Sequence, residues 1–261
     1  MSKYGIIDSH AHICGNDLFP RFEQVVADAK AAGICRILIV CTEVEEAKRA
    51  VQIAENDPMF DVALAFYPND VLKASEEDFA EMEKLVRAGK TIAVGEIGMD
   101  TVGFGDVKVP LSLQEKAFIR QIQLANECNK PILVHMREAT EYTLPIMKQY
   151  LKVPGIMHCY SGGYDVMQEF LDMGMYLSFS GNITFEDDQQ TYLAVKNVPL
   201  DRILIETDAP SLIPAPMQGK PNEPSYIVYV IERICEIRGC SKEELIEAVY
   251  HNYHRLFGIA E

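Results

Sequence analysis

The chain has 261 residues, 48% of them hydrophobic, and its 24 Lys and Arg residues against 39 Asp and Glu residues give a formal net charge of −15. This composition excludes an intrinsically disordered chain, and the negative charge opposes long-range attraction to polyanions such as nucleic acids. The length suits one domain over residues 1–261, most often an α/β barrel or a doubly wound sheet.

The N-terminal segment MSKYGIID contains no long apolar stretch and no small-residue cleavage site, and no apolar run is long enough to cross a bilayer. The seven cysteines are odd in number, form no CxxC pair and mostly stand in apolar stretches. These features predict a cytoplasmic protein in a reducing compartment, without membrane contact and without an obligate protein partner.

Eight short apolar runs alternate with longer amphipathic segments along the whole chain. We expect each run to form a strand, and the runs begin near Tyr4, Cys35, Phe60, Thr91, Pro131, Gly155, Met175 and Arg202. Helices are predicted between them, most clearly over residues 45–56, 76–89, 112–130, 164–174, 224–239 and 241–259, with Ser112 and Ser241 as N-caps. Eight βα units with nearly continuous apolar strands predict a parallel sheet closed into a single-domain (β/α)8 TIM barrel.

The first predicted strand carries two histidines in the segment IIDSHAHI, Ile6 to Ile13. Side chains alternate along a strand, so His10 and His12 share one face with Asp8. Two interpretations of the imidazoles are open at this point, a buried hydrogen-bonded pair or a pair of metal ligands.

Further polar residues stand at the C-terminal ends of the predicted strands, where the chemistry of such barrels takes place. With the first two histidines they form a set of six, namely His10, His12, Glu96, His135, His158 and Asp208. Each alone has a structural interpretation, such as a salt bridge for Glu96 or a capped turn for Asp208. Their common location favours metal binding, because mixed imidazole and carboxylate ligands suit divalent transition metals.

These residues stand in the motifs DSHAHI, VGEIGMD, PILVHMRE, HCYSG and ETDAP. The series, in this order and with GKPNEP and NYHRLF, resembles the TatD family of metal-dependent deoxyribonucleases, a branch of the amidohydrolase-like barrels, over essentially the whole chain. The resemblance implies that the six residues bind two divalent ions, zinc, manganese or magnesium, with Glu96 bridging them and Asp208 accepting the proton of the attacking water. Asp8 would orient the ligand histidines or accept a backbone hydrogen bond.

Two segments depart from the family pattern. The segment AFYPND has Tyr67 before Pro68, where the family commonly has a His-Pro pair, and TVGFGDVK, residues 101–108, is unlike the aromatic-rich segment expected after VGEIGMD. Both segments are predicted to line the mouth of the barrel. They leave the metal ligands intact and bear on the choice of substrate.

Substrate contacts are predicted near the ligands. Arg137 follows the histidine of the fifth strand by two residues, so its guanidinium could form a fork with a phosphate or a surface salt bridge. Tyr160 and Tyr67 could stack on a nucleobase or pack a loop. Glu206 is expected to pack against a cation or a ligand histidine.

The resemblance implies a metal-dependent phosphodiesterase that hydrolyses DNA, as a 3'-5' exonuclease on single-stranded or frayed ends, with only weak electrostatic attraction to its substrate. A second hypothesis is a hydrolase of a small amide, lactone or phosphoester, which the negative charge does not oppose. A third, a non-catalytic metal-binding or partner-binding barrel, is disfavoured because all six ligand positions and Arg137 are present.

Overall fold

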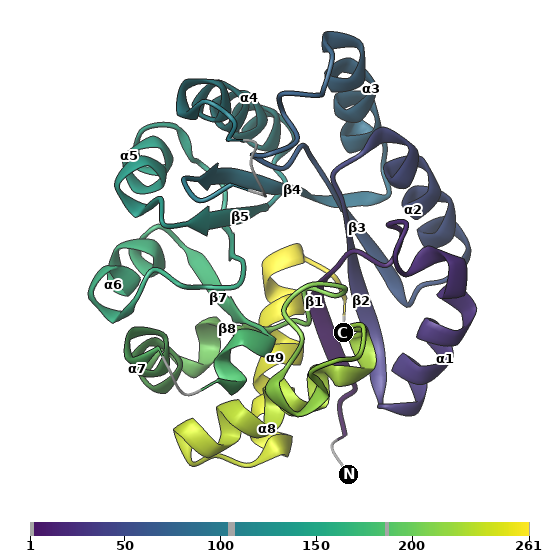
Figure 1. Ribbon diagram of the computed structural model, residues 1–261, viewed down its shortest axis with the longest axis vertical. Helices are drawn as coiled ribbons and strands as arrows, with labels where there is room; N and C mark the ends of the chain where they lie inside the picture. The colour runs from purple at the N-terminus through teal and green to yellow at the C-terminus, as the bar shows by residue number, and fades with distance from the viewer. Residues whose placement is uncertain (1–2, 104–107, 186–187, 261) are drawn as a thin grey trace.

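The computed structural model describes residues 3–103, 108–185 and 188–260, and within them eight parallel strands form one sheet in the order β1 to β8 (Figure 1). The strands are β1 (Ile6–Ala11), β2 (Ile34–Cys41), β3 (Phe60–Leu64), β4 (Thr91–Asp100), β5 (Ile132–Arg137), β6 (Gly155–Met157), β7 (Met175–Phe179) and β8 (Ile203–Ile205). Their side chains are almost all buried, as expected of parallel strands covered on both faces.

Hydrogen bonds between the first and last strand segments close the sheet into a barrel. The Asp208 amide donates to the carbonyl of His10 at 2.9 Å, and the His12 amide donates to the carbonyl of Ala209 at 2.8 Å. The Ser9 hydroxyl donates to the Ile205 carbonyl at 2.9 Å. The seam of the barrel therefore runs through residues of the predicted metal site, and the predicted (β/α)8 barrel is confirmed.

Glycine permits the close approach of β4 and β5. Gly98 has a φ of +146°, and a Cβ at this position would overlap the carbonyl oxygen of His135. Only glycine adopts this backbone without strain. The two glycines of VGEIGMD thus let Glu96 lie beside His135 on the inner face of the barrel.

Helices form the outer ring (Figure 1). They are α1 (Phe22–Ala31), α2 (Val44–Asn56), α3 (Glu76–Arg87), α4 (Leu111–Cys128), α5 (Thr140–Tyr150), α6 (Tyr164–Asp172), α7 (Gln189–Asn197), α8 (Ile227–Arg238) and α9 (Lys242–Phe257). The predicted cap at Ser241 is confirmed, since its hydroxyl accepts the Glu244 amide at 3.2 Å. The predicted cap at Ser112 is wrong, because α4 begins at Leu111 with Pro110 before it and has no side-chain cap.

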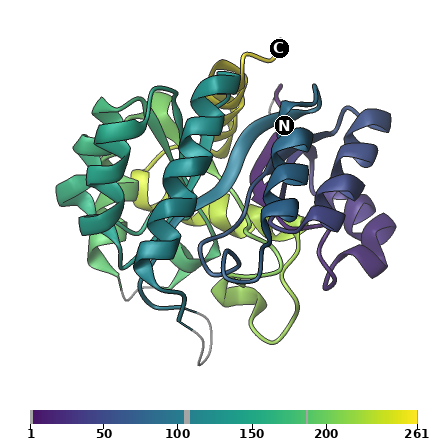
Figure 2. The same ribbon diagram turned by 90° about the horizontal axis from the view of Figure 1, so that it is seen from above.

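The two ends of the barrel differ. Helix α9 packs against β1 and β8, and the Tyr253 hydroxyl donates to Asp61 in β3 at 2.9 Å, near the N-terminal ends of the strands. The loops that follow the strands extend on the opposite side of the barrel from the C-terminus (Figure 2). No helix within the described part of the chain is long and apolar enough to span a membrane.

Candidate active site

A cavity of about 610 Å³ opens at the C-terminal ends of the strands. Five of the six predicted ligands line it, and the sixth, His10, lies completely buried beside them. His10 and Glu96 lie within β1 and β4 and His135 within β5, while His12, His158 and Asp208 follow the ends of β1, β6 and β8. The structure thus brings all six side chains to one mouth, and their role as ligands stays a prediction.

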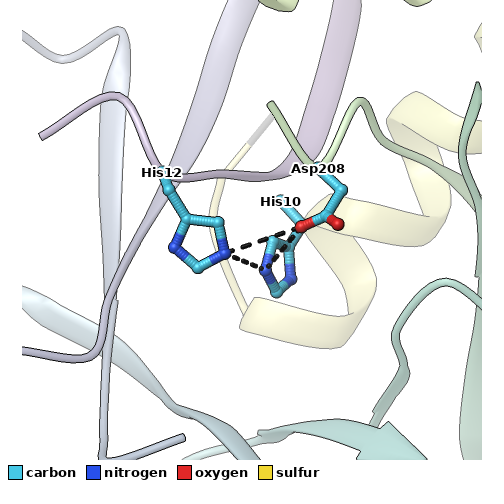
Figure 3. A group of neighbouring side chains, drawn as sticks. All are labelled: His10, His12 and Asp208. Atoms are coloured by element: carbon cyan, nitrogen blue, oxygen red, sulfur yellow. Dashed lines mark hydrogen bonds and ion pairs between the residues drawn. The ribbon is translucent and has the colours of Figure 1, made fainter. Parts of the chain in front are cut away.

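The first group of donor atoms combines the two imidazoles of His10 and His12 with the carboxylate of Asp208 (Figure 3), and Glu96 lies beside them. The Nε2 atoms of His10 and His12 are 3.1 Å apart, and each lies 3.5 or 3.6 Å from Oδ1 of Asp208. Both also lie 3.5 Å from Oε2 of Glu96. Four donors about 2.0–2.2 Å from one ion in a tetrahedron would be about 3.3–3.6 Å apart, so this group fits a divalent ion.

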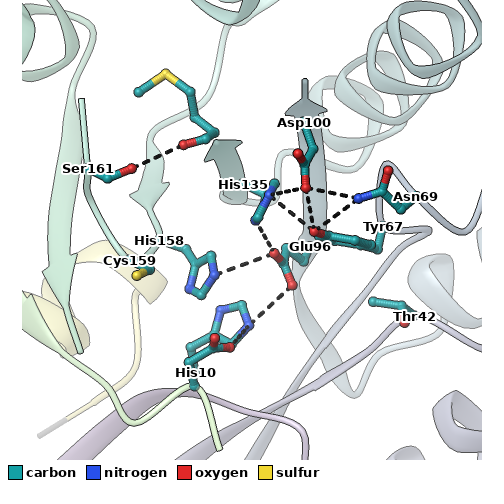
Figure 4. Close-up of polar contacts among 12 residues, drawn as sticks. His10, Thr42, Tyr67, Asn69, Glu96, Asp100, His135, His158, Cys159 and Ser161 are labelled. Carbon is teal, nitrogen blue, oxygen red and sulfur yellow. Dashed lines mark hydrogen bonds and ion pairs between the residues drawn. The ribbon is translucent and has the colours of Figure 1, made fainter. Parts of the chain in front are cut away.

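The second group uses the other oxygen of the same glutamate (Figure 4). Oε1 of Glu96 lies 2.8 Å from Nδ1 of His135 and 3.4 Å from Nε2 of His158. The 2.8 Å separation is a hydrogen-bond distance, shorter than the edge of a ligand tetrahedron. Each oxygen of Glu96 thus faces a different imidazole pair, which is the arrangement that a bridging carboxylate requires.

Two buried carboxylates, Glu206 and Asp8, contact the site from inside the barrel. Oε1 of Glu206 lies 2.7 Å from Nδ1 of His158 and accepts the Cys159 amide at 2.9 Å, which confirms the contact predicted for Glu206. Asp8 accepts the amide of Thr207 at 3.0 Å and that of His10 at 3.3 Å. Asp8 therefore ties β1 to the segment after β8 through backbone amides, the second of its two interpretations.

Asp100 is a further residue of the site, one for which the sequence motifs predicted no role. Its Oδ2 accepts hydrogen bonds from the Tyr67 hydroxyl at 3.0 Å and from Nδ2 of Asn69 at 2.9 Å, and it lies 3.3 Å from Nε2 of His135. This contact fixes the imidazole with Nδ1 toward Glu96. The signal was present, because Asp100 is four residues after Glu96 on the same strand and so on the same face.

The electrostatic field of the site favours positive charge. Burial lowers the pKa of His12, but hydrogen bonds with Asp208 and Glu96 outweigh it and raise that pKa to about 10. Burial raises the pKa of Glu96, yet the charge of His158 and the surrounding imidazoles hold it well below its usual range. Carboxylates that stabilise protons on imidazoles would also stabilise bound cations.

Unusual backbone conformations gather at the same mouth. Among the described non-glycine residues with positive φ, Glu138, Cys159, Asp208 and Leu212 all line the cavity, with φ between 41° and 54°. The remaining one, Asn129, ends helix α4. Strained residues of this kind cluster at functional sites, because the surrounding structure must hold them there.

The two predicted substrate contacts differ in exposure, since Arg137 lies at the mouth of the cavity and Tyr160 is buried. Arg137 is exposed, lines the cavity and has no ion pair with any residue that the structure describes, so the alternative of a surface salt bridge is not observed. Tyr160 is only 2% exposed, packs against Phe170 and Phe179, and donates its hydroxyl to the carbonyl of Gly163. The prediction that Tyr160 stacks on substrate is therefore wrong.

Of the two segments that depart from the family pattern, the structure describes the one around Tyr67 fully and the one over residues 101–108 only in part. Tyr67 lines the cavity, in edge contact with the imidazole of His135. Of the segment 101–108, residues 104–107 lie outside the described part of the chain. Tyr67 is therefore the departure from the family pattern that the structure places in the cavity.

Imidazoles and carboxylates that converge at the mouth of a parallel eight-stranded barrel define a metal-dependent hydrolase. A model of the family described as TatD related DNase matches residues 7–258, and the chain belongs to this family. The resemblance inferred from the motifs is thereby confirmed.

Individual relatives agree with this assignment over nearly their whole length. The chain is 38% identical to the uncharacterized metal-dependent hydrolase YabD of Bacillus subtilis, covering 97% of this chain and 99% of that protein. It is 32% identical to the 3'-5' ssDNA/RNA exonuclease TatD of Enterobacter lignolyticus, covering 91% and 93%. The crystal structure of the TatD homologue YJJV of Escherichia coli superposes with a TM-score of 0.91 at 29% identity, covering 98% of both chains.

Proposed function

We propose that this protein is a metal-dependent phosphodiesterase that removes nucleotides in the 3'-5' direction from single-stranded or frayed DNA ends. The observation that carries the proposal is the guanidinium of Arg137, which pairs with no acidic residue of the described chain and lies at the rim of a cavity that also contains the candidate metal ligands. A fork of donors beside two cation sites suits a phosphodiester better than an uncharged ester or amide. The exonuclease name of the Enterobacter relative supports this choice.

Two divalent ions would be held by the two donor groups, with Glu96 between them, and would supply an activated water and stabilise charge on the phosphoryl oxygens. Arg137 binds a non-bridging phosphate oxygen and orients the scissile bond. Asp208 accepts the proton of the attacking water at its carboxylate, which borders the cavity. Asp100 and Tyr67 keep the imidazole of His135 in place.

The size of the cavity supports cleavage at an end. About 610 Å³ is the volume of a pocket for one small ligand, which corresponds to a nucleotide and excludes a duplex. A frayed or single-stranded terminus can enter such a cavity, whereas the middle of a stiff duplex cannot.

The proposal of two ions predicts the metal content. Titration of metal-free protein with zinc or manganese should saturate near two ions per chain, and Glu96→Ala should reduce the content to one or none, because both donor groups lose an oxygen. Elemental analysis after gel filtration measures this. Saturation of the unmodified protein at one ion would contradict the bridging role of Glu96.

Arg137→Ala should lower kcat/KM about 10- to 100-fold on substrates that carry a phosphate, since a hydrogen bond to a charged group contributes about 1.5–3 kcal/mol. The kcat/KM of the same variant on uncharged esters should fall less than threefold. The matched control is Arg87→Ala, which removes a guanidinium that pairs with Glu127 on the outer helices. Equal losses on both substrate types would exclude a phosphate contact for Arg137.

The proposal as a whole is tested by side-by-side turnover on end-labelled oligonucleotides and on a panel of small esters, lactones and amides, with metal saturating. We expect nucleotide release from the oligonucleotides to be fastest. Absence of any nucleic-acid cleavage, together with rapid hydrolysis of one of the small substrates, would favour the small-molecule hydrolase instead.

A further inference from the structure

The exposed large hydrophobic side chains of the described chain gather on the face that carries the cavity. They are Leu72, Val102, Tyr142, Tyr164, Phe185 and Tyr192. Each lies in a segment that follows a strand or in the first turn of the next helix. Scattered apolar residues on a surface are ordinary, but their restriction to one end of a barrel indicates a binding face.

Two of these side chains line a second hollow beside the cavity. This hollow has a volume of about 290 Å³ and lies between the short helix η2 (Gly181–Thr184) and helices α7 and α8. Its wall includes Phe185, which is 41% exposed, and Tyr192, which is 38% exposed. Asn182 lines both the hollow and the cavity, so the two adjoin at η2.

The lining of the hollow combines apolar faces with polar edges. Ile183 and Ile237 add apolar surface to the two rings, and Arg233 supplies a cation. Arg233 is held in place, because its Nε donates to the Ile183 carbonyl at 3.2 Å and its Nη1 donates to Glu236 at 2.8 Å. A planar group with hydrogen-bonding edges, such as a nucleobase, matches this lining.

Among the described residues that line the hollow, the one carboxylate is already engaged in hydrogen bonds. The carboxylate of Asp188 caps α7, accepting the Gln190 amide at 2.9 Å and the Thr191 amide at 3.1 Å. A carboxylate bound by the N-terminal amides of a helix repels an approaching phosphate less than a free one. The described lining of the hollow thus offers one cation, Arg233, and one carboxylate that is already hydrogen-bonded, Asp188.

We propose that this hollow binds a base of the single-stranded substrate, one that follows the nucleotide held in the cavity. The inference rests on the proposed nuclease function and extends it, since it identifies where the strand leaves the site. The strand passes over Asn182, and its base stacks on Phe185 or Tyr192. Stacking of this kind accepts any base, so the contact raises affinity for a strand without imposing a sequence.

The test compares two substrates in one set of variants. The first is a single-stranded oligonucleotide, which can reach the hollow, and the second is the p-nitrophenyl ester of thymidine monophosphate, which cannot. The double variant Phe185→Ala with Tyr192→Ala should raise KM for the oligonucleotide about 5- to 100-fold, the range that corresponds to one lost stacking contact. Its KM for the ester should change less than twofold, which also shows that the double variant is folded.

Two further variants sharpen the test. Tyr142→Ala removes an equally exposed tyrosine, 38% exposed on α5, that does not line the hollow, so KM should stay at its original value. Phe185→Tyr with Tyr192→Phe keeps both rings and should also restore the original KM. A KM for the oligonucleotide that is unchanged in the double alanine variant, or raised equally by Tyr142→Ala, would overturn the inference. Failure of the unmodified protein to cleave any oligonucleotide would instead overturn the proposed function itself.

Discussion

Asp208→Asn is expected to lower turnover about 10²–10⁴-fold, the range typical of a lost general base, while most of the bound metal is retained. The amide keeps an oxygen that can face His10 and His12, whose Nε2 atoms lie 3.5–3.6 Å from the present carboxylate oxygen. It cannot accept a proton from water. Burial raises the pKa of Asp208, but the charge of His158 and the contacts with His12 and His10 together outweigh it and lower that pKa, so the carboxylate is ionised.

The measurement pairs kcat at saturating substrate with elemental analysis of the same preparation. The matched control is Asp70→Asn, because Asp70 lines the same cavity, accepts a hydrogen bond from the Thr42 hydroxyl and belongs to neither donor group. This control should keep turnover within a fewfold of the original. If Asp208→Asn lost metal and turnover in equal proportion, Asp208 would be a ligand alone.

The strands could be predicted from the sequence because burial on both faces leaves a continuous apolar run. All eight predicted strands are present and begin within two residues of the expected positions. The helices were harder to predict than the strands. Helices α1, α5 and α7 lie outside the ranges named from sequence, and α5 even contains Pro145 in its interior. Such short helices depend on packing against the barrel more than on their own sequence.

The site could be predicted only as far as strand alternation holds. His10 was found in this way within β1, whereas Glu96 was found from its place near the end of the predicted fourth strand. Tyr160 was misplaced because β6 ends at Met157, and the positive φ of Cys159 turns the chain before Tyr160. The separation of two residues from His158 therefore no longer places both side chains on one face. Contacts that depend on such a turn have no simple periodic signal.

Closed circular single strands should be cleaved at least about 100-fold more slowly than linear strands of the same sequence, because a substrate that cannot enter the site loses the orientation that the site provides. The cavity that contains the donor groups is small and carries a single unpaired guanidinium among its described lining residues. A terminus can enter it, whereas a circle has none to offer. Blunt duplexes should be intermediate, because their ends fray.

Salt should have only a mild effect on the same reaction. With a net charge of −15 and Arg137 as the exposed cation at the cavity, we expect about one to three phosphates to be neutralised, which gives a slope of log affinity against log salt of about −0.7 to −2 for a single strand. A protein that wraps a duplex with six to ten phosphate contacts would have a much steeper slope. The experiment measures KM for linear strands across a salt series and cleavage rates for linear, duplex and circular substrates, with metal saturating. Rapid cleavage of circles would exclude the end-directed mechanism, and a steep slope would require cationic contacts beyond the lining of the cavity.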